Sequence, residues 1–230
     1  MSRIGANLEE IHNRIEVAAT KAGRDPERVR LVAVSKKVDA DALREAFACG
    51  QRLFGENYLQ EAEAKIAELG AGYQWHFIGH LQSNKTAQAA GLFDLIETVD
   101  RLKVAAALDR NLAGSGRVLA VLLQVNIGRE PQKSGVLPEE AAVLLAKVRE
   151  LPHLVVRGLM VMPPFLDEAE AVRPFFRQTR ELAVKLADLG LLPPADEVDL
   201  SMGMSGDYEV AVEEGATLVR LGTALFGARG

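Results

Sequence analysis

The stretch RLVAVSKKVDADALREAF, residues 30–47, joins a short apolar run to a segment with helical spacing. Residues 31–34 are apolar without interruption, which is typical of a strand buried on both faces of a parallel sheet. Charged and apolar residues then follow at helical spacing over 39–48, which predicts an amphipathic helix. A strand followed by such a helix is the unit from which α/β folds are built. The type of α/β fold depends on how often this unit recurs.

The same unit recurs along the whole chain, with short runs rich in Val, Leu and Ile between longer segments of helical spacing. This alternation predicts right-handed βαβ connections and a parallel sheet. The candidate strands are residues 30–35, 51–55, 74–79, 92–99, 117–126, 154–162, 197–203 and 216–222. The candidate helices between them are residues 39–48, 58–69, 83–90, 101–112, 138–149, 168–189 and 205–214.

Eight candidate strands predict one closed (β/α)8 barrel of the TIM type, with residues 1–230 forming a single domain. An open doubly wound sheet is the alternative, but no glycine-rich dinucleotide fingerprint follows the first strand. No linker, low-complexity tract or break in composition divides the chain. An extra N-terminal helix is predicted by the spacing of Ile4, Leu8, Ile11, Ile15 and Ala18.

Composition is that of an ordinary globular protein, with 48% hydrophobic and 26% charged residues and a net charge of −5. This mild acidity gives no reason to expect a nucleic acid or a membrane surface as partner. The N-terminus lacks the apolar segment of a signal peptide, and no run is long enough to cross a bilayer. The single cysteine, Cys49, excludes a disulfide within the chain and favours a reducing, cytoplasmic setting. Its apolar neighbours favour a small core residue.

Polar residues collect where the candidate strands end. In barrels of this type the active site forms at the carboxyl ends of the strands, so these residues are expected to meet at one mouth. They are Lys36, Glu56, Asn57, His80, Gln124, Asn126, Ser201, Arg220, Gly222 and Thr223.

Two lysines follow the first strand, and the side-chain alternation of a strand distinguishes them. Val32, Val34 and Lys36 share one face, whereas Lys37 belongs to the other. Bulky branched residues dominate barrel interiors, which predicts that the face with Val32 and Val34 points inward. Lys36 is then expected in the mouth and Lys37 toward the helices or solvent. Lysines in such sites can serve as Schiff-base nucleophiles.

The segments LSMGMSGD (200–207) and VRLGTALFG (219–227) follow the seventh and eighth strands, where barrels of this type bind phosphate. Gly222 permits close approach of an anion to the backbone, and Thr223 adds an N–H and a hydroxyl. Ser201 and Ser205 follow the seventh strand, with Ser205 at the start of the next candidate helix. The alternative is that Ser205 is only a helix cap and Gly222 only a turn residue.

Other site chemistries find no support in the sequence. His76 and His80 lie on a strand and its loop, so their spacing of four does not make a helical metal-binding pair, and no metal site is predicted. No Walker loop, ordered serine–histidine–aspartate set or nucleic-acid motif is present.

Several motifs together resemble one known family, the pyridoxal phosphate homeostasis proteins, which are related to the N-terminal barrel of alanine racemase. The resemblance covers nearly the whole chain in the right order. The motifs are AVSK (33–36), FGENY (54–58), WHFIGHLQSNK (75–85), KSG (133–135), GLM (158–160), LSMGMSGD (200–207) and VRLGTALFG (219–227).

The resemblance implies a barrel of the alanine racemase N-terminal kind that binds pyridoxal 5′-phosphate. It implies a Schiff base on Lys36, the lysine of AVSK. The further contacts that it implies are Asn57 near the ring, Ser201, Ser205 and the Gly222–Thr223 backbone at the phosphate, and Arg220 near the pyridine nitrogen.

Two function classes follow from this resemblance: a protein that stores, buffers or delivers the cofactor, and an amino-acid racemase-like enzyme. The racemase resemblance implies a second base from a C-terminal β-domain, and the chain stops at Gly230, soon after the eighth strand. A guanidinium at the ring nitrogen also disfavours protonation of that nitrogen. We therefore expect the non-catalytic class, with apo pyridoxal-phosphate enzymes as partners and a monomer or weak dimer. A Schiff-base aldolase acting on a sugar phosphate is a third interpretation.

Overall fold

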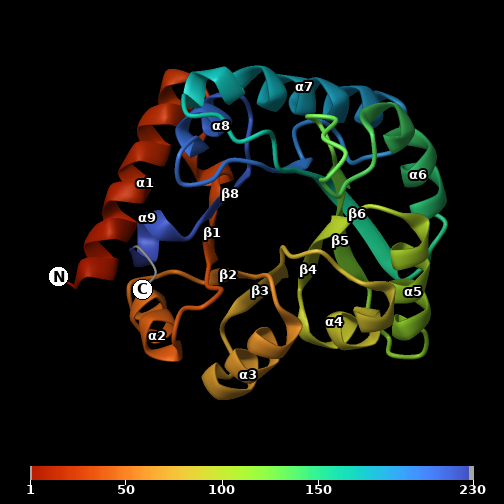
Figure 1. Cartoon of the computed structure of the whole chain (residues 1–230), viewed down its shortest axis with the longest axis horizontal. Coiled ribbons are helices and arrows are strands. Elements are labelled where there is room, and N and C mark those ends of the chain that lie inside the picture. The colour runs from red at the N-terminus through yellow and green to blue at the C-terminus, as the bar shows by residue number, and fades with distance from the viewer. Residues whose placement is uncertain (1, 228–230) are drawn as a thin grey trace.

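The computed structural model describes residues 2–227, and its strands close into one parallel barrel (Figure 1). The eight strands follow one another around the barrel in chain order, and β8 pairs with β1. The predicted (β/α)8 barrel is confirmed, and each predicted strand overlaps an observed one. The strands are β1 (Arg30–Val34), β2 (Leu53–Glu56), β3 (Gln74–Phe77), β4 (Leu95–Val99), β5 (Leu119–Val125), β6 (Leu154–Val161), β7 (Asp199–Ser201) and β8 (Leu218–Leu221).

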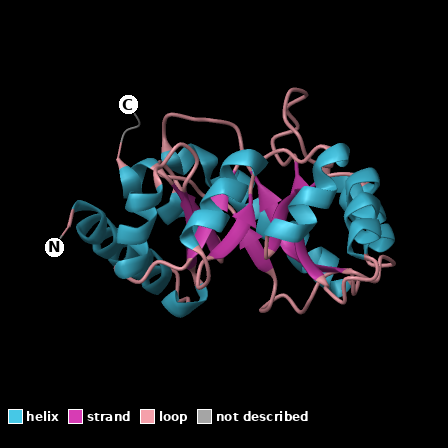
Figure 2. Cartoon of the chain, turned by 90° about the horizontal axis from the view of Figure 1, so that it is seen from below, coloured by secondary structure: helices cyan, strands magenta, loops and turns pink. Residues whose placement is uncertain are grey.

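The helices form a layer outside the strands, as the side view in Figure 2 shows. They are α1 (Arg3–Lys21), α2 (Ala40–Ala48), α3 (Leu59–Leu69), α4 (Thr86–Leu92), α5 (Leu102–Leu112), α6 (Ala141–Val148), α7 (Ala169–Asp188), α8 (Tyr208–Glu213) and α9 (Thr223–Phe226). Short 3₁₀ turns lie at Pro26–Arg28, Ser83–Lys85 and Pro138–Glu140. None of the described helices is long and apolar enough to cross a membrane.

Two helical segments differ from the prediction. The helix predicted to start at residue 205 starts at Tyr208, because residues 204–207 form a turn in which Asp207 Oδ1 accepts the Met204 N–H at 2.6 Å. Helix α9 was not predicted at all, since four residues are too few to show a helical period.

The extra N-terminal helix is confirmed as α1, which packs against α2, α8 and α9 (Figure 1). Two of its polar side chains hold the carbonyl groups of α9. Asn7 Nδ2 donates to Leu225 O at 2.8 Å, and an Arg3 guanidinium nitrogen donates to Phe226 O at 3.0 Å. The apolar stripe predicted for this helix is buried, with Ile4, Leu8, Ile11, Ile15 and Ala18 each at most 6% exposed. Complete burial of one such aliphatic side chain contributes about 1.5–3 kcal/mol.

The barrel interior begins with an apolar layer. Its side chains are Val32, Leu53, Leu95, Leu122, Met160 and Leu218. Leu31 and Ala33, the neighbours of Val32, instead join the separate core between the strands and the helices. The predicted inward face of the first strand is therefore confirmed at Val32. Beyond this layer the interior becomes polar, toward the carboxyl ends of the strands.

Cys49 corrects one prediction. It is exposed and caps the end of α2, so its interpretation as a core residue was wrong. The apolar face of this helix is carried by Leu43 and Ala46, which are completely buried. Residue 49 lies past the last helical turn, where that periodicity no longer applies.

Candidate functional site

A cavity of about 420 Å³ opens at the carboxyl ends of the strands. Its wall brings together residues from β1 and β8 and from the segments that follow β2, β3, β6 and β7. Six of the seven predicted site residues line it, namely Lys36, Asn57, Ser205, Arg220, Gly222 and Thr223. The seventh, Ser201, lies in the polar interior and is not part of the wall.

The two neighbouring lysines, Lys36 and Lys37, have different surroundings at this mouth. Lys36 lies on the cavity wall with Val34, whereas Lys37 is exposed. The backbone of Lys37 has a φ of 58°, in the left-handed region that non-glycine residues seldom occupy. Its N–H donates to Glu61 Oε1 at 2.5 Å. The turn at residue 37 thus takes the chain away from the mouth directly after Lys36.

Arg220 is the buried cation of the site, with 4% of its surface exposed. One guanidinium nitrogen donates to Ser201 Oγ at 2.6 Å, and the other donates to Val161 O at 2.8 Å. Both contacts fix the plane of the guanidinium, so Arg220 presents a charge of fixed orientation to the cavity.

Ser201 links Arg220 to the buried carboxylate of Glu97. Ser201 Oγ donates to Glu97 Oε2 at 2.5 Å, and Glu97 Oε1 is 2.7 Å from His76 Nδ1. These four residues come from β3, β4, β7 and β8, so the network spans the barrel interior. We call this chain of His76, Glu97, Ser201 and Arg220 the interior network.

Electrostatic compensation explains how the interior network tolerates its charges. Burial by itself would raise the pKa of Glu97, but the contacts with His76, Arg220 and Ser201 outweigh burial and hold this pKa below its ordinary value. Burial lowers the pKa of Arg220, while Glu97 and Asp207 oppose that change. Glu97 is therefore an anion whose charge balances the buried guanidinium.

The two predicted phosphate loops lie against each other. Ser205 Oγ accepts the N–H of Ala224, in the first turn of α9, at 3.3 Å. Gly222 and Thr223 begin the same turn and share the cavity wall with Ser205. Ser205 does not cap α8, because the residue before that helix is Asp207. The hydroxyl and the backbone of this turn form one polar rim on the cavity.

Asn57 presents a buried amide oxygen, Oδ1, that has no hydrogen-bond partner among the described residues. Buried polar atoms of this kind are rare and call for a donor. The segment after β3 approaches Asn57 closely at Gly79, where a Cβ would lie only 2.2 Å from the carbonyl oxygen of Asn57. A ligand hydroxyl would satisfy the Asn57 oxygen.

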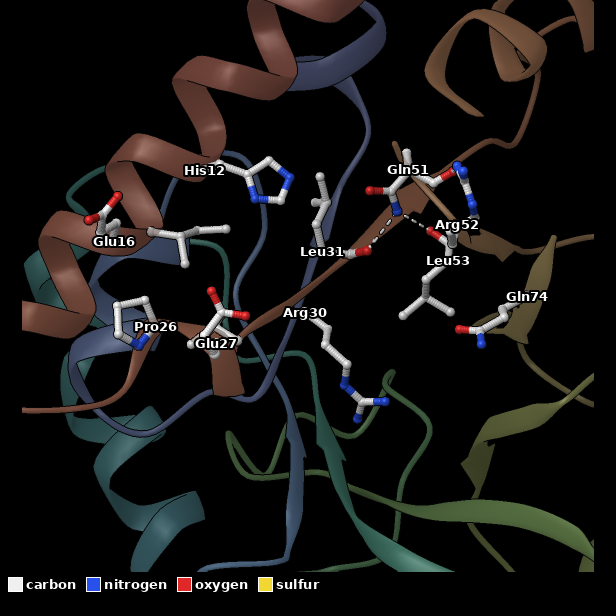
Figure 3. A pocket seen from close by; sticks show the side chains of 12 residues that line it. His12, Glu16, Pro26, Glu27, Arg30, Leu31, Gln51, Arg52, Leu53 and Gln74 are labelled. Atoms are coloured by element: carbon white, nitrogen blue, oxygen red, sulfur yellow. Dashed lines mark hydrogen bonds between the residues drawn. The ribbon is translucent and has the colours of Figure 1, made fainter. Parts of the chain in front are cut away.

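A second cavity, of about 570 Å³, lies at the opposite end of the barrel, beside α1 (Figure 3). Three of its polar side chains, Gln51, Arg52 and Arg30, have partners within the chain. Gln51 Nε2 donates to the carbonyl oxygens of Leu31 at 2.8 Å and Leu53 at 2.5 Å, as drawn in Figure 3. Arg30 pairs with Asp199 at 2.6 Å. This end of a barrel serves stability, and none of the described residues that line the cavity has a buried side-chain atom without a hydrogen-bond partner.

Three residues of the candidate site were not predicted from the sequence. Glu97 sits inside an apolar run that was predicted only as a strand, His76 was considered only as a metal ligand, and Asp207 was assigned to a helix. The available signal was Glu97 itself, the single charged residue in LIETV, residues 95–99. A lone carboxylate on the inward face of a strand needs a buried partner. No group of three or more metal-ligating side chains occurs within residues 2–227.

Comparison with known proteins gives consistent matches over the whole chain. Residues 6–230 match the family described as alanine racemase, N-terminal domain. The pyridoxal phosphate homeostasis protein of Pseudomonas aeruginosa is 50% identical over 230 residues, which cover 100% of this chain and 97% of that protein. Its namesake from Escherichia coli K12 is 47% identical over 233 residues, covering 100% and 98% respectively.

A solved structure extends this similarity to three dimensions. The structure of PipY from Synechococcus elongatus, with pyridoxal phosphate bound, superposes with a TM-score of 0.81. The two sequences are 40% identical, and the match covers 93% of this chain and 100% of the PipY chain.

Proposed function

We propose that this chain, which belongs to the alanine racemase N-terminal domain family and within it to the pyridoxal phosphate homeostasis proteins, binds pyridoxal 5′-phosphate at the barrel mouth. In this proposal it stores, buffers or delivers the cofactor inside the cell. The names of relatives at 47–50% identity and the cofactor in PipY support the ligand.

The observation that carries the proposal is the composition of the mouth cavity. One wall supplies a primary amine, Lys36, and another supplies a polar rim at Ser205, Gly222 and Thr223. Amine, rim and guanidinium match the aldehyde, phosphate and ring nitrogen of pyridoxal phosphate. The apolar side chains of Val34, Ile78 and Met162 line the same cavity and suit the faces of an aromatic ring. The unsatisfied oxygen of Asn57 suits the ring hydroxyl.

Lys36 is the proposed attachment point. Its ε-amine would condense with the aldehyde of pyridoxal phosphate, with a C=N bond formed in place of the C=O bond and the oxygen released as water. Lys36 lies on the cavity wall and Lys37 is exposed, which supports Lys36 as the anchor. Ser201 stays a predicted phosphate contact. Its observed partners, Arg220 and Glu97, suggest instead that it supports the guanidinium.

We propose that the protein is a carrier without substantial catalytic activity. Bound pyridoxal phosphate supplies an electron sink whose strength depends on protonation of the ring nitrogen. Arg220 is held against Val161 and Ser201, and a guanidinium beside that nitrogen disfavours its protonation. Among the described residues, no tyrosine, histidine or cysteine lines the cavity to act as a second base opposite Lys36.

A racemase-like enzyme is the second candidate function. The match to the alanine racemase N-terminal domain over residues 6–230 favours it, because the same barrel serves an enzyme there. Lys36 alone can move a proton to and from one face of a substrate carbon. The proposal for a carrier therefore depends on the weakness of the ring as an electron sink and on the absence of tyrosine, histidine and cysteine from the described cavity wall.

The partners and setting are proposed from the same reasoning. A carrier must hand its cofactor to apo enzymes that use pyridoxal phosphate, and we propose these as its partners. We propose a monomer or weak dimer that works in the cytoplasm, since one cysteine allows no disulfide within the chain. Neither a nucleic acid nor a membrane is part of the proposal.

The test is reconstitution of the purified protein with pyridoxal phosphate, followed by borohydride reduction and peptide mass mapping. We expect a visible absorption band that reduction removes, and a pyridoxyl group on Lys36. Lys36→Ala should abolish the adduct, and Lys37→Ala should not. Loaded protein should then activate an added apo enzyme. Absence of the band, or an adduct mainly on Lys37, would contradict the proposal.

A further inference from the structure

Three charged side chains hold the backbone around Lys36 from outside the barrel. They are Glu56 at the end of β2, and Glu61 and Lys65 on α3. We call these three residues the outer clamp. None of them lines the mouth cavity. They contact Ser35 and Lys37, the residues immediately before and after Lys36.

Lys65 is the centre of the outer clamp. Its side chain is only 9% exposed, which is unusual for a lysine and calls for paired partners. Its ammonium carries three N–H donors, and the structure provides three acceptors. These are Ser35 O at 2.6 Å, Glu56 Oε1 at 2.8 Å and Glu61 Oε1 at 2.7 Å.

The residue before Lys36 is held twice. Ser35 is completely buried, and its hydroxyl donates to Glu56 Oε1 at 2.7 Å. Its carbonyl oxygen accepts the Lys65 contact, so both the side chain and the backbone of Ser35 are tied to charged groups. Ser35 therefore cannot rotate without breaking two charge-assisted hydrogen bonds.

The residue after Lys36 is held in an unfavourable conformation. Lys37 has a φ of 58°, and its N–H donates to Glu61 Oε1, the oxygen that also accepts from Lys65. A non-glycine residue keeps such a φ only where surrounding contacts enforce it. The outer clamp thus enforces the turn by which Lys36 faces the cavity while Lys37 faces solvent.

We propose that Lys65, together with Glu56 and Glu61, positions Lys36 for Schiff-base formation with pyridoxal phosphate. The inference rests on the proposed function, since it concerns how the same lysine is aimed. Lys65, Glu56 and Glu61 act through the backbone on both sides of Lys36 and touch no ligand. Their loss should affect the condensation of the amine with the aldehyde more than the non-covalent binding of the ring and phosphate.

The experiment separates these two steps with two ligands. Pyridoxal 5′-phosphate condenses with an amine, whereas pyridoxine 5′-phosphate carries an alcohol in place of the aldehyde and can only bind. Condensation is followed by stopped-flow absorbance under saturating ligand. Binding of pyridoxine phosphate is measured by calorimetry.

In Lys65→Met we expect condensation to slow by about 10–100-fold, the effect of a small misplacement of a reacting group. Affinity for pyridoxine phosphate should stay close to that of the wild type. Because Lys65→Met leaves Glu56 buried without its cation, Glu61→Ala serves as a second variant. It releases the Lys37 N–H and keeps the Lys65–Glu56 pair, and its condensation should also slow.

Arg44→Ala is the matched control. Arg44 joins Asp41 and Glu68 on the exposed surface between α2 and α3, at 2.7 Å each, so its loss loosens α3 without touching the outer clamp. We expect its condensation rate to equal that of the wild type.

Wild-type condensation rates in folded Lys65→Met and Glu61→Ala would overturn the positioning role. Equal losses of condensation and pyridoxine phosphate binding would do the same, because they would indicate general damage to the site. Wild-type protein that binds neither ligand would instead overturn the proposed function and, with it, the role of the clamp.

Discussion

Arg220 and Glu97 face each other across the hydroxyl of Ser201, which accepts from the guanidinium at 2.6 Å and donates to the carboxylate at 2.5 Å. The guanidinium lines the mouth cavity, while the carboxylate is completely buried. The positive charge of Arg220 on the cavity wall is therefore balanced by an anion inside the barrel. Substitution of Glu97 should change both the stability of the protein and its affinity for the ligand.

Glu97→Gln should lower the free energy of unfolding by about 3–5 kcal/mol at neutral pH, because it leaves the Arg220 guanidinium buried without its anion. Urea unfolding of the ligand-free protein measures this loss. Glu139→Gln is the control, since Glu139 makes an exposed pair with Arg129 and its loss should leave the free energy of unfolding almost unchanged. Equal effects of the two variants would mean that Glu97 carries no special charge balance.

The dependence of the unfolding free energy on pH in the acid range should also reveal the charge of Glu97. The pKa of Glu97 is lowered in the folded protein, below about 4.3 for an unfolded glutamate. The folded state therefore binds this proton less readily, so the stabilisation from Glu97 is present above pH 4.3 and is lost as pH falls through the folded pKa. Unfolding free energy measured against pH should fall less steeply below that point in Glu97→Gln than in the wild type. Parallel curves would contradict the assignment.

Ser205→Ala should weaken pyridoxal phosphate binding by about tenfold or more, because a hydrogen bond to a charged group is worth roughly 1.5–3 kcal/mol. Titration of the apo protein measures the dissociation constant. Pyridoxal, which lacks the phosphate, provides the control, and its affinity should be the same in Ser205→Ala and in the wild type. A similar loss for both ligands would remove Ser205 from the phosphate rim.

Lys37→Gly should stabilise the protein relative to Lys37→Ala by about 1 kcal/mol, because an L-residue in the left-handed region is strained and glycine is not. Thermal or urea unfolding of the two variants gives the difference. The sign is the informative part of the result. If Lys37→Ala were the more stable variant, the turn after Lys36 would not have the positive φ on which the outer clamp acts.

The loaded protein should not exchange the α-hydrogens of amino acids at an enzymatic rate. A general acid–base group contributes about 10²–10⁴-fold, and within the described chain no tyrosine, histidine or cysteine lines the cavity as a second base opposite Lys36. Incubation with each common amino acid in deuterated water, followed by NMR, measures the exchange. Turnover of about 1 per second or faster that disappears in Lys36→Ala would show that the racemase-like alternative is correct.

The barrel could be predicted because its signals are periodic. Eight apolar runs gave the strand number, and the alternation of Val32 with its neighbours gave the inward face of β1. The resemblance to a known family brought the remaining wall residues together, and six of the seven line one cavity.

What the sequence could not predict depends on partners far away in the chain. Glu97 and Ser201 are 104 positions apart, so no local pattern announces their hydrogen bond. Glu56 was expected at the mouth and lies instead in the outer clamp, since Lys65 meets Ser35 and Glu56 only after α3 packs on β2. The predictions for Cys49 and for the start of α8 were wrong for a different reason, because a helical period says little about the residue at which a helix ends or begins.

The contact between α1 and α9 sets an order of events during biosynthesis. Asn7 and Leu225 are 218 positions apart, and α9 carries the turn that Ser205 holds at the cavity. These segments cannot meet until residue 225 has left the ribosome, so the ligand rim cannot form on a shorter nascent chain. Pyridoxal phosphate should therefore be captured only after α9 has packed against α1.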